Sequence, residues 1–429
     1  MGVVSSLTGR TPVAPPPSVE VLVVGAGPTG SAAAIWAARA GLDVLLLDAA
    51  VFPRDKTCGD GLTPRAMAEM DRLGLGGWAR GHATNTGLRL MGFGREQVID
   101  WPDRAFPTTG SAVRRTVLDD RIRREAITAG ATMIDGARVT GIEYDGARVA
   151  AAEVTIDGAV HLVACRVLIV ADGVRSPVGR MLGRTWHRDT PYGVAARAYI
   201  ASDRHDDPRI SSHLELRDAA GTLLSGYGWI FPLGDGTVNI GAGSLQTAAR
   251  PARAPMRPLL AHYVDRRRED WELTGEAESF ASALLPMGGA VEGVAGANWA
   301  LVGDAAACVN PLNGEGIDYG LEGARLLVDL LTARGLGADL TRAWPLLLST
   351  HYGPSFALAR RLAGLLTLPR FLPAAGPVGM SSQALMTAAV RVMGNLVTEQ
   401  DTDLVGRTWR AVGRGAERID RRPLFGASG

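Results

Sequence analysis

Three glycines stand at the spacing of a nucleotide-binding turn. Gly25, Gly27 and Gly30 directly follow the apolar run 21–24 and precede a predicted helix over 31–40. The first glycine permits a tight turn, the second lets a pyrophosphate approach the backbone, and the third allows the helix to pack closely on the strand. The phosphates would then sit at the N-terminus of the helix, where backbone N–H groups and the helix dipole attract anions.

An acidic residue ends the next apolar run. Asp48 closes the segment 43–48, so that strand, helix and strand follow one another within about 30 residues. A carboxylate at this position accepts hydrogen bonds from ribose hydroxyls, which favours FAD or NAD over the phosphorylated NADP. The glycine spacing alone is a weak signal, because a chain with 54 glycines contains chance matches. Combined with this order of elements, it predicts a dinucleotide site.

Two later segments also join a buried strand to an acid and a glycine. The run 167–171 leads into an Asp-Gly pair, and the run 299–302 leads into a Gly-Asp pair and then a Gly-x-Gly loop. The residues concerned are Asp172, Gly173, Gly303, Asp304, Gly314 and Gly316. Carboxylates at strand ends can bind ribityl hydroxyls, and a glycine-rich helix start can face the anionic edge of a flavin. Each segment alone is equally well explained as a capped strand end, but the three in this order favour FAD.

This set of motifs resembles the FAD-binding fold of the para-hydroxybenzoate hydroxylase-like flavoproteins. Arg115, in the segment Arg115-Thr-Val-Leu-Asp119, fits that superfamily's arginine ahead of a helix beside the cofactor. The resemblance implies an α/β protein (α+β, with two domains) and FAD as cofactor. A Rossmann-type FAD-binding domain would carry an inserted antiparallel β-sheet domain for the substrate, followed by C-terminal helices.

Within this superfamily, the chain is similar to the geranylgeranyl reductases over roughly residues 19–415. Two segments carry the similarity, Phe52-Pro-Arg-Asp-Lys-Thr-Cys-Gly-Asp-Gly and Tyr227-Gly-Trp-Ile-Phe-Pro. The segments 365–373 and 393–398 resemble the actinobacterial branch that includes menaquinone reductases. The resemblance implies an FAD-dependent reductase that saturates C=C bonds of a polyprenyl chain, on menaquinone or on a geranylgeranyl lipid.

Three aromatic side chains offer the apolar surface that such a substrate needs. Reduction of an isolated C=C bond requires a hydride, a proton and a dry slot for the alkene. Tyr227, Trp229 and Phe231 alternate along a predicted strand, so they share one face. The resemblance makes this face the wall of an isoprenoid pocket, whereas the spacing alone favours a stripe of core residues.

The loop after the second predicted strand supplies the candidate catalytic residue. The resemblance places Cys58 near the flavin ring, as a proton donor or as a residue that gates the flavin. A buried structural thiol is the alternative. Arg54 and Lys56 either neutralise the pyrophosphate or the reduced flavin, or are ordinary solvated charges of a loop. Cys308 stands where many relatives carry a small residue, and we assign it no role.

Two other functions are open on the sequence. Flavin-dependent monooxygenases and halogenases, which act on aromatic or polyketide substrates, share the fold. In halogenases, however, the aromatic motif usually reads Trp-x-Trp-x-Ile-Pro, where this chain has Tyr227 and Phe231. A non-catalytic flavoprotein that binds or presents a prenyl lipid is the second alternative.

Composition limits the partners. Lysine and arginine total 45 against 44 acidic residues, and a net charge of +1 argues against nucleic-acid binding. Seven histidines without a His-Glu-x-x-His spacing give no support for a catalytic metal. No second Gly-x-Gly-x-x-Gly follows a later strand, so no dedicated NAD(P)H domain is expected. The electron donor stays open among an NAD(P)H-linked reductase, a ferredoxin and similar proteins.

The elements that must position these residues are dispersed along the chain. We predict a flexible leader over 1–18 and a helical region over 341–429, which Pro369, Pro373 and Pro377 break into segments. The FAD-binding domain is predicted from residues 19–80, 110–180 and 286–340, and the substrate-binding sheet domain from 81–109 and 181–285.

Nothing in the sequence predicts export or a membrane span. The leader has no apolar h-region, and no window offers roughly 18 uncharged apolar residues. Three scattered cysteines suit a reducing, cytoplasmic setting. The apolar segments 362–368 and 385–397 contain interspersed arginines. They either pack against the FAD-binding domain or form a lipid-facing entrance that holds the enzyme peripherally on the inner face of the membrane.

Overall fold

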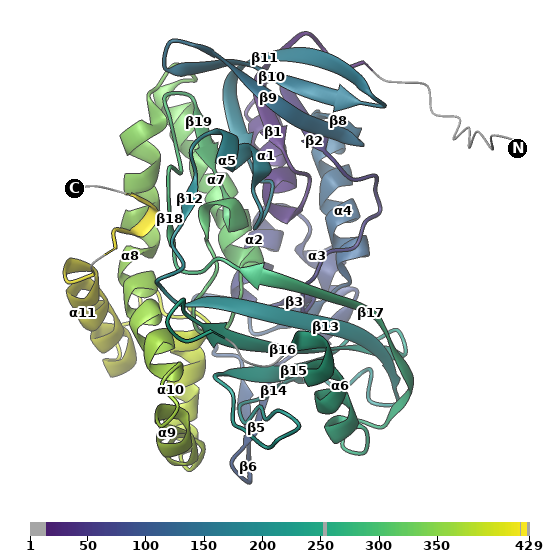
Figure 1. The fold of residues 1–429 in the computed structure, drawn as a ribbon, viewed down its shortest axis with the longest axis vertical. Coiled ribbons are helices and arrows are strands. Elements are labelled where there is room, and N and C mark those ends of the chain that lie inside the picture. The colour runs from purple at the N-terminus through teal and green to yellow at the C-terminus, as the bar shows by residue number, and fades with distance from the viewer. Residues whose placement is uncertain (1–13, 252–254, 421, 427–429) are drawn as a thin grey trace, which may run out of the picture.

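The computed structural model describes residues 14–251, 255–420 and 422–426. Figure 1 shows a mainly parallel sheet in the upper half, an antiparallel sheet in the lower half, and the C-terminal helices along the left side. Most of the predicted leader, residues 1–13, lies outside the described residues. The carbonyl oxygen of Pro17 already bonds to the upper sheet, because it accepts a hydrogen bond from the Ala164 N–H at 3.0 Å.

The upper sheet has a parallel centre and an antiparallel edge. Its order in the described chain is β8-β2-β1-β11-β10-β9, and β19 pairs with the C-terminal end of β11. Strands β8, β2, β1, β11 and β19 run parallel. The bounds are β1 Ser18–Val24, β2 Val44–Asp48, β8 Thr132–Asp135, β9 Ala137–Asp145, β10 Arg148–Ile156, β11 Ala159–Val170 and β19 Trp299–Leu301. The carboxyl ends of the parallel strands meet at one edge, where ligands bind in open α/β sheets.

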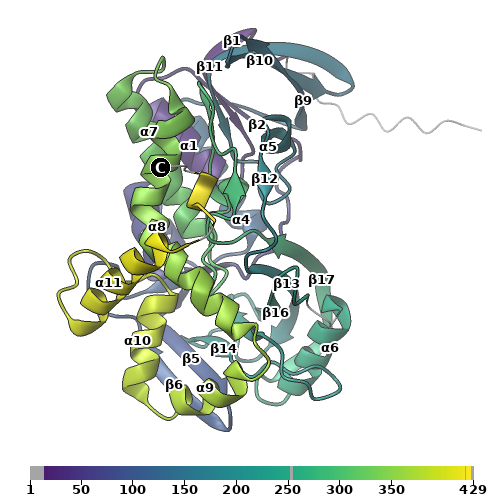
Figure 2. The same ribbon diagram turned by 60° about the vertical axis from the view of Figure 1, so that its left-hand side comes forward.

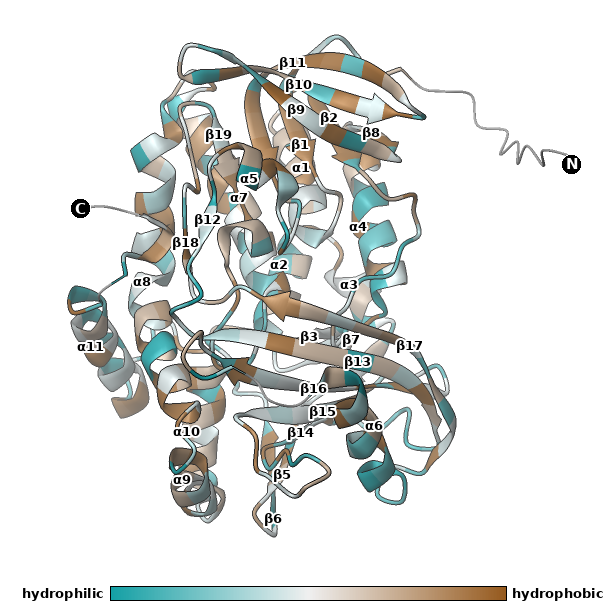
Figure 3. Cartoon of the chain, viewed as in Figure 1, coloured by the Kyte–Doolittle hydropathy of each residue, from teal (hydrophilic) through white to brown (hydrophobic). Residues whose placement is uncertain are grey.

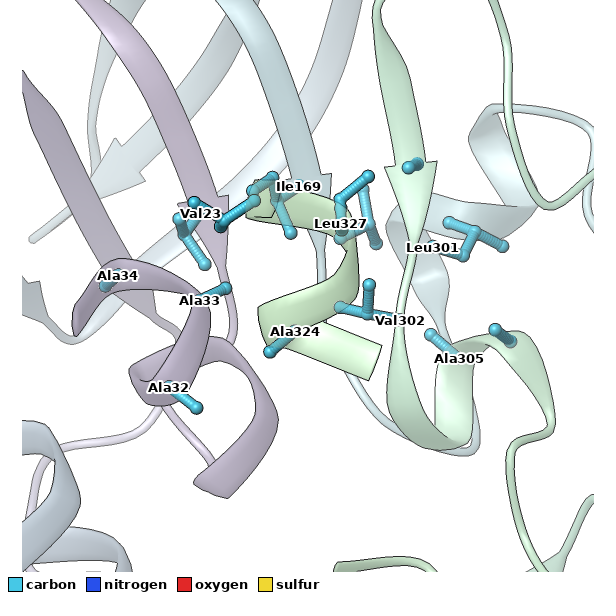
Figure 4. Packing of buried hydrophobic residues seen from close by; sticks show 14 of the residues in the cluster. Val23, Ala32, Ala33, Ala34, Ile169, Leu301, Val302, Ala305, Ala324 and Leu327 are labelled. Carbon is cyan, nitrogen blue, oxygen red and sulfur yellow. The ribbon is translucent and has the colours of Figure 1, made fainter. Parts of the chain in front are cut away.

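Three helices bury one face of the parallel strands, namely α1 (Pro28–Arg39), α4 (Arg115–Thr128) and α7 (Ile317–Arg334). The apolar runs of β1 and β2 are typical of parallel strands that are covered on both faces. Figure 4 shows alanines of α1 beside Val23 of β1, with Leu327 of α7 close to Ile169. Small side chains on α1 let the helix lie close to the sheet. Figure 3 shows hydrophobic residues along β1 and β11 and hydrophilic residues along α4.

The lower sheet carries the aromatic motif. Its order in the described chain is β17-β13-β16-β15-β14-β5-β6, antiparallel except for the β14–β5 pair. The bounds are β5 Gly87–Gly92, β6 Arg95–Asp100, β13 Tyr192–Ser202, β14 Ile210–His213, β15 Gly226–Pro232, β16 Thr237–Gln246 and β17 Leu273–Leu285. Helix α6 (Met256–Arg267) packs on one face of this sheet, where its buried residues form a separate core with β13 and β16. The other face is free to meet the upper sheet.

Most of the shorter elements lie in the segments that connect the two sheets. The shorter elements are β3 Gly61–Leu62, β4 Ala83–Asn85, β7 Gly110–Ala112, β12 Thr185–Trp186, β18 Val291–Glu292, α2 Pro64–Arg72, α3 Gly76–Arg80, α5 Pro177–Met181 and the 3-10 helices η1 Gly303–Ala306 and η2 Leu424–Gly426. Strands β3, β7 and β4 form a small sheet of their own. Strand β4 therefore pairs outside the lower sheet, although it lies within the segment 81–109 that was assigned to the substrate domain. The domain boundaries stay a prediction.

Four α-helices follow α7 in the described chain, namely α8 Leu340–Leu366, α9 Phe371–Met380, α10 Gln383–Met393 and α11 Leu404–Arg418. Helix α8 packs on the upper sheet, where the Trp344 indole donates to the Leu301 carbonyl oxygen at 2.8 Å. Helices α9 and α10 instead contact β5 and β6 of the lower sheet (Figure 2).

The predicted break points in this region are partly wrong. A break does occur around Pro369, between α8 and α9, but α9 continues through Pro373 and Pro377. Pro373 lies in the first turn, where its missing N–H would have had no partner within the helix. Pro377 removes only one hydrogen bond from a helix that is packed against its neighbours.

Candidate active site

The glycine turn between β1 and α1 forms an open cradle at the carboxyl ends of the parallel strands. Gly25 has a φ of +101°, and a Cβ atom there would lie 2.4 Å from the carbonyl oxygen of Ala171. A Cβ atom on Gly30 would lie 1.8 Å from the carbonyl oxygen of Gly25. Gly27 is the N-cap of α1, so no side chain covers the first N–H groups of the helix. The turn therefore requires glycine and offers donors to an anion.

Asp48 is fixed beside this turn. Its Oδ2 accepts a hydrogen bond from the Ala26 N–H and its Oδ1 accepts one from the Ala50 N–H, each at 2.8 Å. Both bonds orient the carboxylate at the end of β2. Each oxygen keeps a second lone pair, so Asp48 can also accept hydrogen bonds from ribose hydroxyls.

Two arginines reach over the turn. A Cβ atom on Gly27 would lie 3.4 Å from Nη2 of Arg54 and 4.0 Å from Nη2 of Arg115. Both guanidinium groups bind Asp119, Arg54 at 2.9 Å and Arg115 at 2.6 and 2.8 Å. Arg54 also lies 3.8 Å from the Asp48 carboxylate. Asp119 thus holds both positive charges where an anion on the turn would meet them.

Asp172 and Gly173 follow β11. Asp172 Oδ2 accepts a hydrogen bond from the Val178 N–H at 2.8 Å, so the residue caps α5. Its Oδ1 is buried and has no hydrogen-bond partner among the described residues. Burial raises the pKa of this carboxyl. Gly173 has a φ of +77°, and a Cβ atom there would lie 3.7 Å from Lys56 Nζ.

Asp304 faces the same lysine. Its Oδ2 lies 3.0 Å from Lys56 Nζ. Burial would raise the pKa of Asp304, but the charge of Lys56 holds it below its usual range. Gly303, at φ +61°, packs against Thr29 of α1, and Gly316 is the N-cap of α7, with Gly314 at φ +76° before it.

These groups fit the parts of FAD. The space above the glycine turn, which side chains on these glycines would fill, can hold a pyrophosphate. Two guanidinium groups and the N-terminus of α1 lie next to it. The unpartnered Oδ1 of Asp172 and the carboxylate of Asp304 can accept hydrogen bonds from ribityl hydroxyls. The uncovered N-terminus of α7 can face the anionic edge of the flavin. The fold brings all these predicted cofactor residues together at one edge of the upper sheet.

The segment 55–61, which we call the Cys58 loop, is anchored to the lower sheet. Arg197 of β13 is fully buried and binds both carboxylate oxygens of Asp55, at 2.5 and 2.6 Å. Arg197 also donates to the carbonyl oxygens of Ser279 and Lys56. Burial raises the pKa of the Cys58 thiol although the Arg115 charge opposes the rise, so the thiol stays protonated at neutral pH.

A buried polar network lies under this loop. Asp60 Oδ2 accepts hydrogen bonds from the Tyr199 hydroxyl at 2.7 Å and from Asn239 Nδ2 at 2.9 Å. Asn239 Nδ2 also donates to the Cys58 carbonyl oxygen, and its Oδ1 accepts from Trp229 Nε1, both at 2.9 Å. Burial raises the pKa of Asp60 to about 6, although both donors favour its charged form. The network joins the Cys58 loop to the aromatic motif.

The sequence interpretation missed Asp60, Tyr199 and Asn239. The only signal was the place of Asp60 two residues after Cys58, in a segment that carried the family resemblance. Nothing near Asn239 in the sequence indicates a site, because its role depends on the pairing of β16 with β15.

The aromatic motif lies along one wall of a cavity of about 460 Å³. The ring centroids of Tyr227 and Trp229 are 6.0 Å apart, and those of Trp229 and Phe231 are 6.4 Å apart. A Cβ atom on Gly59 or Gly61 would lie 3.0 Å from the Phe231 ring. The glycines of the Cys58 loop therefore leave room for the aromatic wall.

The cavity joins the two groups of predicted residues. At one end it is lined by Cys58, Arg115, Asp304, Gly314 and Gly316. Beyond the aromatic wall it passes between the lower sheet and helices α9 and α10. Apolar residues of this end include Leu90, Ile210, Leu372, Met380, Met386 and Val390. A largely apolar cavity with a few polar groups at one end is typical of a site for an elongated apolar ligand.

Known proteins are similar to this chain in sequence. A family model for an FAD binding domain matches residues 18–220. The menaquinone reductase of Mycobacterium tuberculosis is 59% identical over 408 residues, which span 95% of this chain and 98% of that protein. The digeranylgeranylglycerophospholipid reductase 2 of Methanopyrus kandleri is 31% identical over 76% of this chain and 79% of its own length. The chain belongs to the geranylgeranyl reductase family.

Solved structures agree on the fold of this reductase. A geranylgeranyl bacteriochlorophyll reductase-like protein from Thermoplasma acidophilum has a TM-score of 0.74 at 22% identity, covering 92% of this chain and 99% of its own. A flavin-dependent brominase has a TM-score of 0.72 at 20% identity, covering 94% of this chain and all of its own. The halogenase alternative thus shares the fold, whereas the reductases share the sequence. The prediction of an FAD-dependent oxidoreductase of the reductase family is confirmed.

A carboxylate that the sequence interpretation left without a role also lines the cavity of the reductase. Glu315 stands between Gly314 and Gly316 and accepts hydrogen bonds from the Thr63 hydroxyl and from Asn313 Nδ2, the latter at 3.2 Å. Burial raises the pKa of Glu315 to about 7. The signal in the sequence was a single acid within a Gly-x-Gly loop.

Two kinds of feature are absent from the described part of the chain. No helix in it is long and apolar enough to cross a membrane. No group of three or more His, Cys, Asp and Glu side chains in it could hold a metal ion.

Proposed function

We propose that this reductase saturates one or more C=C bonds in the isoprenoid side chain of menaquinone, with a geranylgeranyl lipid as the alternative substrate. The cavity carries the proposal, because its aromatic wall continues from the predicted flavin site into an apolar channel. A prenyl chain offers only apolar contacts, and such a channel would bury it and exclude water. The names and the high identity of the menaquinone reductases support the quinone over other prenyl lipids.

Reduced FAD supplies a hydride when it is bound. The residues of the chain bind, orient and protect the reactants. Arg54, Asp48 and the glycine turn would hold the nucleotide part of FAD, and Asp304 and Asp172 the ribityl chain. Tyr227, Trp229 and Phe231 would hold the prenyl chain against the site. Cys58, which lines the same cavity, would lie beside the flavin and gate access to the ring.

An anaerobic assay tests the substrate. The holoenzyme is reduced with dithionite and mixed with menaquinone, geranylgeranyl lipid or menadione, a naphthoquinone without a prenyl chain. Mass spectrometry of the extracted lipid is expected to show a gain of two hydrogens per saturated bond in the side chain of menaquinone. If only the geranylgeranyl lipid gained hydrogens, that lipid would be the substrate in place of menaquinone. Bound flavin with an unchanged side chain on both lipids would overturn the proposed function.

The electrons would come from a separate protein, either an NAD(P)H-linked reductase or a ferredoxin. The sequence supports this, because no second Gly-x-Gly-x-x-Gly that could form a dedicated NAD(P)H domain follows a later strand. Anaerobic absorbance spectra test it, because NADPH alone should leave the flavin oxidised, while reduced ferredoxin or an added reductase should bleach it. Rapid bleaching by NADPH alone would contradict this part of the proposal.

Helix α9 supports a peripheral position on a lipid bilayer. No charged residue occurs between Arg370 and Arg391, a stretch that includes all of α9 and most of α10. One side of α9 lines the cavity, while Val378 on the other side is 61% exposed and Leu385 of α10 is 53% exposed. A helix that is apolar all round is normally covered on all sides. Since the channel passes between these helices and the lower sheet, a bilayer would cover the exposed side and supply the substrate.

Flotation with vesicles of anionic phospholipid tests this position. The wild-type protein should float with the vesicles, and the double variant Val378→Glu, Leu385→Glu should bind them at least tenfold less. The matched control is Val160→Glu, because Val160 is 65% exposed on β11, in the other sheet. Equal flotation of both variants, or none by the wild type, would rule out this surface.

A further inference from the structure

We propose that Glu315 is the proton donor of the reduction, protonating one carbon of the substrate's double bond while the hydride adds to the other. The inference rests on the proposed function, because it assigns a residue to that same reaction. It goes beyond the sequence interpretation, which named Cys58 as the only candidate proton donor.

The position of Glu315 is the first argument. It lines the cavity between two glycines predicted to face the flavin, and Gly316 begins α7. On the substrate side, the Tyr227 hydroxyl donates to the carbonyl oxygen of Asn313, two residues before Glu315. The carboxyl therefore lies where the predicted cofactor loop meets the aromatic wall, and both reactants would lie within the same cavity.

The carboxyl is also held in one orientation. Thr63, the N-cap of α2, donates through its hydroxyl to Oε1. Asn313 donates through Nδ2 to Oε2, and its own Oδ1 accepts from the Glu315 N–H at 2.9 Å. A side chain fixed by two elements loses little conformational entropy when it meets an alkene, which suits a general acid.

Burial favours the neutral form of Glu315, against the charge of Arg65 and the hydrogen bonds from Thr63 and Asn313. Asp318 and Glu322 of α7 are the neighbouring carboxylates. Arg65 of α2 pairs with both of them, and Arg325 of α7 lies 3.8 Å from Glu322 as well. Arg65 Nε lies 3.1 Å from Asp318 Oδ2, and Arg65 also binds Glu322. Arg325 shares Glu322 with Arg65, whereas Arg65 alone is the cation that acts on both Glu315 and Asp318. Charging both of these buried carboxylates would carry a large desolvation cost.

The pKa values of the three carboxyl groups are shifted in different directions. Burial opposes the charge of Glu322, but Arg65 holds its pKa below the usual range. Burial and the Glu315 charge raise the pKa of Asp318, and neither Asp318 oxygen accepts a hydrogen bond from the described residues. Tyr227 and Tyr319, which also face Glu315, stay neutral because burial raises the pKa of each hydroxyl. Glu315, with a pKa of about 7, is the member that both faces the cavity and exchanges its proton near neutral pH.

Cys58 is the weaker acid of the two candidates. Burial raises the pKa of its thiol above an ordinary value that is already near 9. General acids work best when their pKa lies near the working pH, because a weaker acid provides less driving force for the proton transfer. This difference assigns the proton to Glu315 and leaves Cys58 its position beside the flavin.

The reaction balances with these groups. The alkene gains a hydride, with its two electrons, from reduced FAD at one carbon. The π-electron pair of the C=C bond forms the second C–H bond with the proton of Glu315. FAD is oxidised, the alkene becomes an alkane unit, and Glu315 remains as a carboxylate that regains a proton from water before the next turnover.

Infrared difference spectroscopy tests the protonation state without turnover. The spectrum of the wild-type holoenzyme minus that of Glu315→Gln in D₂O should contain the C=O stretch of a protonated carboxyl at pH 6. This band should fade as the pH rises through neutrality, as Glu315 and the neighbouring Asp318 titrate together. Absence of the band at pH 6 would overturn the proposal, even if every variant folded poorly in other assays.

Kinetics of pre-reduced enzyme give the second readout. For the wild type, the rate of prenyl reduction should fall as the pH rises through about 7, because Glu315 loses the proton it donates. Glu315→Gln should retain bound flavin and its photoreduction, yet lower the rate of prenyl reduction by about 10²–10⁴-fold and abolish this pH dependence. Glu315→Asp should recover part of the rate together with the pH dependence. The control Glu399→Gln changes an exposed glutamate outside the cavity and should behave as the wild type.

The outcomes separate the two proposals. A wild-type enzyme that never adds hydrogen to a prenyl chain would overturn the proposed function, whatever the infrared result. An active wild type together with an equally active Glu315→Gln would overturn the role of Glu315 alone. Loss of the pH dependence in Cys58→Ser but not in Glu315→Gln would transfer the proton to the thiol.

Discussion

Asp60 is a carboxylate that the fold buries and then supports with donors. Burial opposes its charge, whereas Asn239 and Tyr199 favour it, and the result is a pKa of about 6 against an ordinary value of 3.8. The folded state therefore binds the proton more tightly than the unfolded state does. The stabilising effect of this protonation is fully present below pH 4 and is lost as the pH rises toward 6.

Substitution of Tyr199 by Phe should expose this balance. The Phe ring keeps the stacking on Arg114 and Arg197, whose guanidinium carbons lie 4.1 and 4.5 Å from the ring centroid. Only the hydroxyl that supports the charged Asp60 is lost. We expect the free energy of unfolding to fall by about 1–2 kcal/mol more at pH 8, where Asp60 is charged, than at pH 5.

Urea denaturation at the two pH values measures this difference. The control is Tyr144→Phe, because Tyr144 is 51% exposed on β9 and its hydroxyl supports no buried charge in the described structure. An equal loss at both pH values for Tyr199→Phe would contradict the assigned role of the hydroxyl.

At the scale of elements, α1 and α7 pack closely at the edge of the upper sheet where the cofactor is predicted to bind. Thr29 in the first turn of α1 lies against two glycines. A Cβ atom would lie 2.5 Å from its Oγ1 if added to Gly303, and 2.1 Å if added to Gly320 of α7. The β-branched Thr29 side chain is stiff, so it has little room to give way. These contacts hold η1 and α7 against the start of α1.

Two glycines of α7 should therefore respond in opposite ways to alanine. Gly320→Ala should lower the free energy of unfolding by about 1–3 kcal/mol, because the new methyl group overpacks against Thr29. Gly323→Ala, one turn later, meets no atom within 4 Å and should stabilise the protein by up to about 1 kcal/mol through helix propensity. Thermal unfolding of the two variants side by side measures this, and equal midpoints would mean that Thr29 moves away freely.

At the scale of the whole molecule, the predicted cofactor residues come from segments far apart in the sequence. Gly25 and Asp48 belong to the first strand–helix–strand unit, Asp172 follows β11, and Asp304 and Gly316 follow β19. FAD that contacts all of them would join these segments, and the C-terminal helices add a second connection because α8 packs on the upper sheet and α9 on the lower.

Nucleotide binding should then stabilise the whole molecule. A ligand that binds only the folded state adds about 1.4 kcal/mol for each tenfold excess over its dissociation constant. We expect FAD and ADP, which share the adenosine diphosphate part, both to raise the melting temperature of flavin-free protein. Asp48→Asn should weaken both effects, since the amide cannot replace both oxygens that accept from Ala26 and Ala50.

Differential scanning fluorimetry over a range of nucleotide concentrations measures these shifts. The control is Asp43→Asn, an exposed carboxylate directly before the other end of β2. If ADP stabilised Asp48→Asn as well as the wild type, the nucleotide would bind elsewhere than at the glycine turn.

The sequence by itself determined the family and predicted which strand ends would bind the cofactor. The glycine turn, the acid that ends β2 and the strands that end at Asp172 and before Gly303 depend on contacts between near neighbours, or on apolar runs that must be buried on both faces. The period of two along β15 likewise determined that Tyr227, Trp229 and Phe231 share a face. Such features can be read locally because the backbone geometry that requires them is local.

Only the tertiary structure decided which polar groups meet. Asp60 and Asn239 are 179 residues apart, and Thr63 and Glu315 are 252 apart, yet each pair forms a hydrogen bond. These pairs depend on the register of β16 against β15 and on the seating of α7 against α2, which no local pattern specifies. The course of α9 through two prolines was likewise decided by packing, because a helix with neighbours on one side tolerates a missing hydrogen bond that an isolated helix would not. The pKa of Glu315 belongs to this group, since it arises from burial between distant segments, which Arg65 and Thr63 oppose.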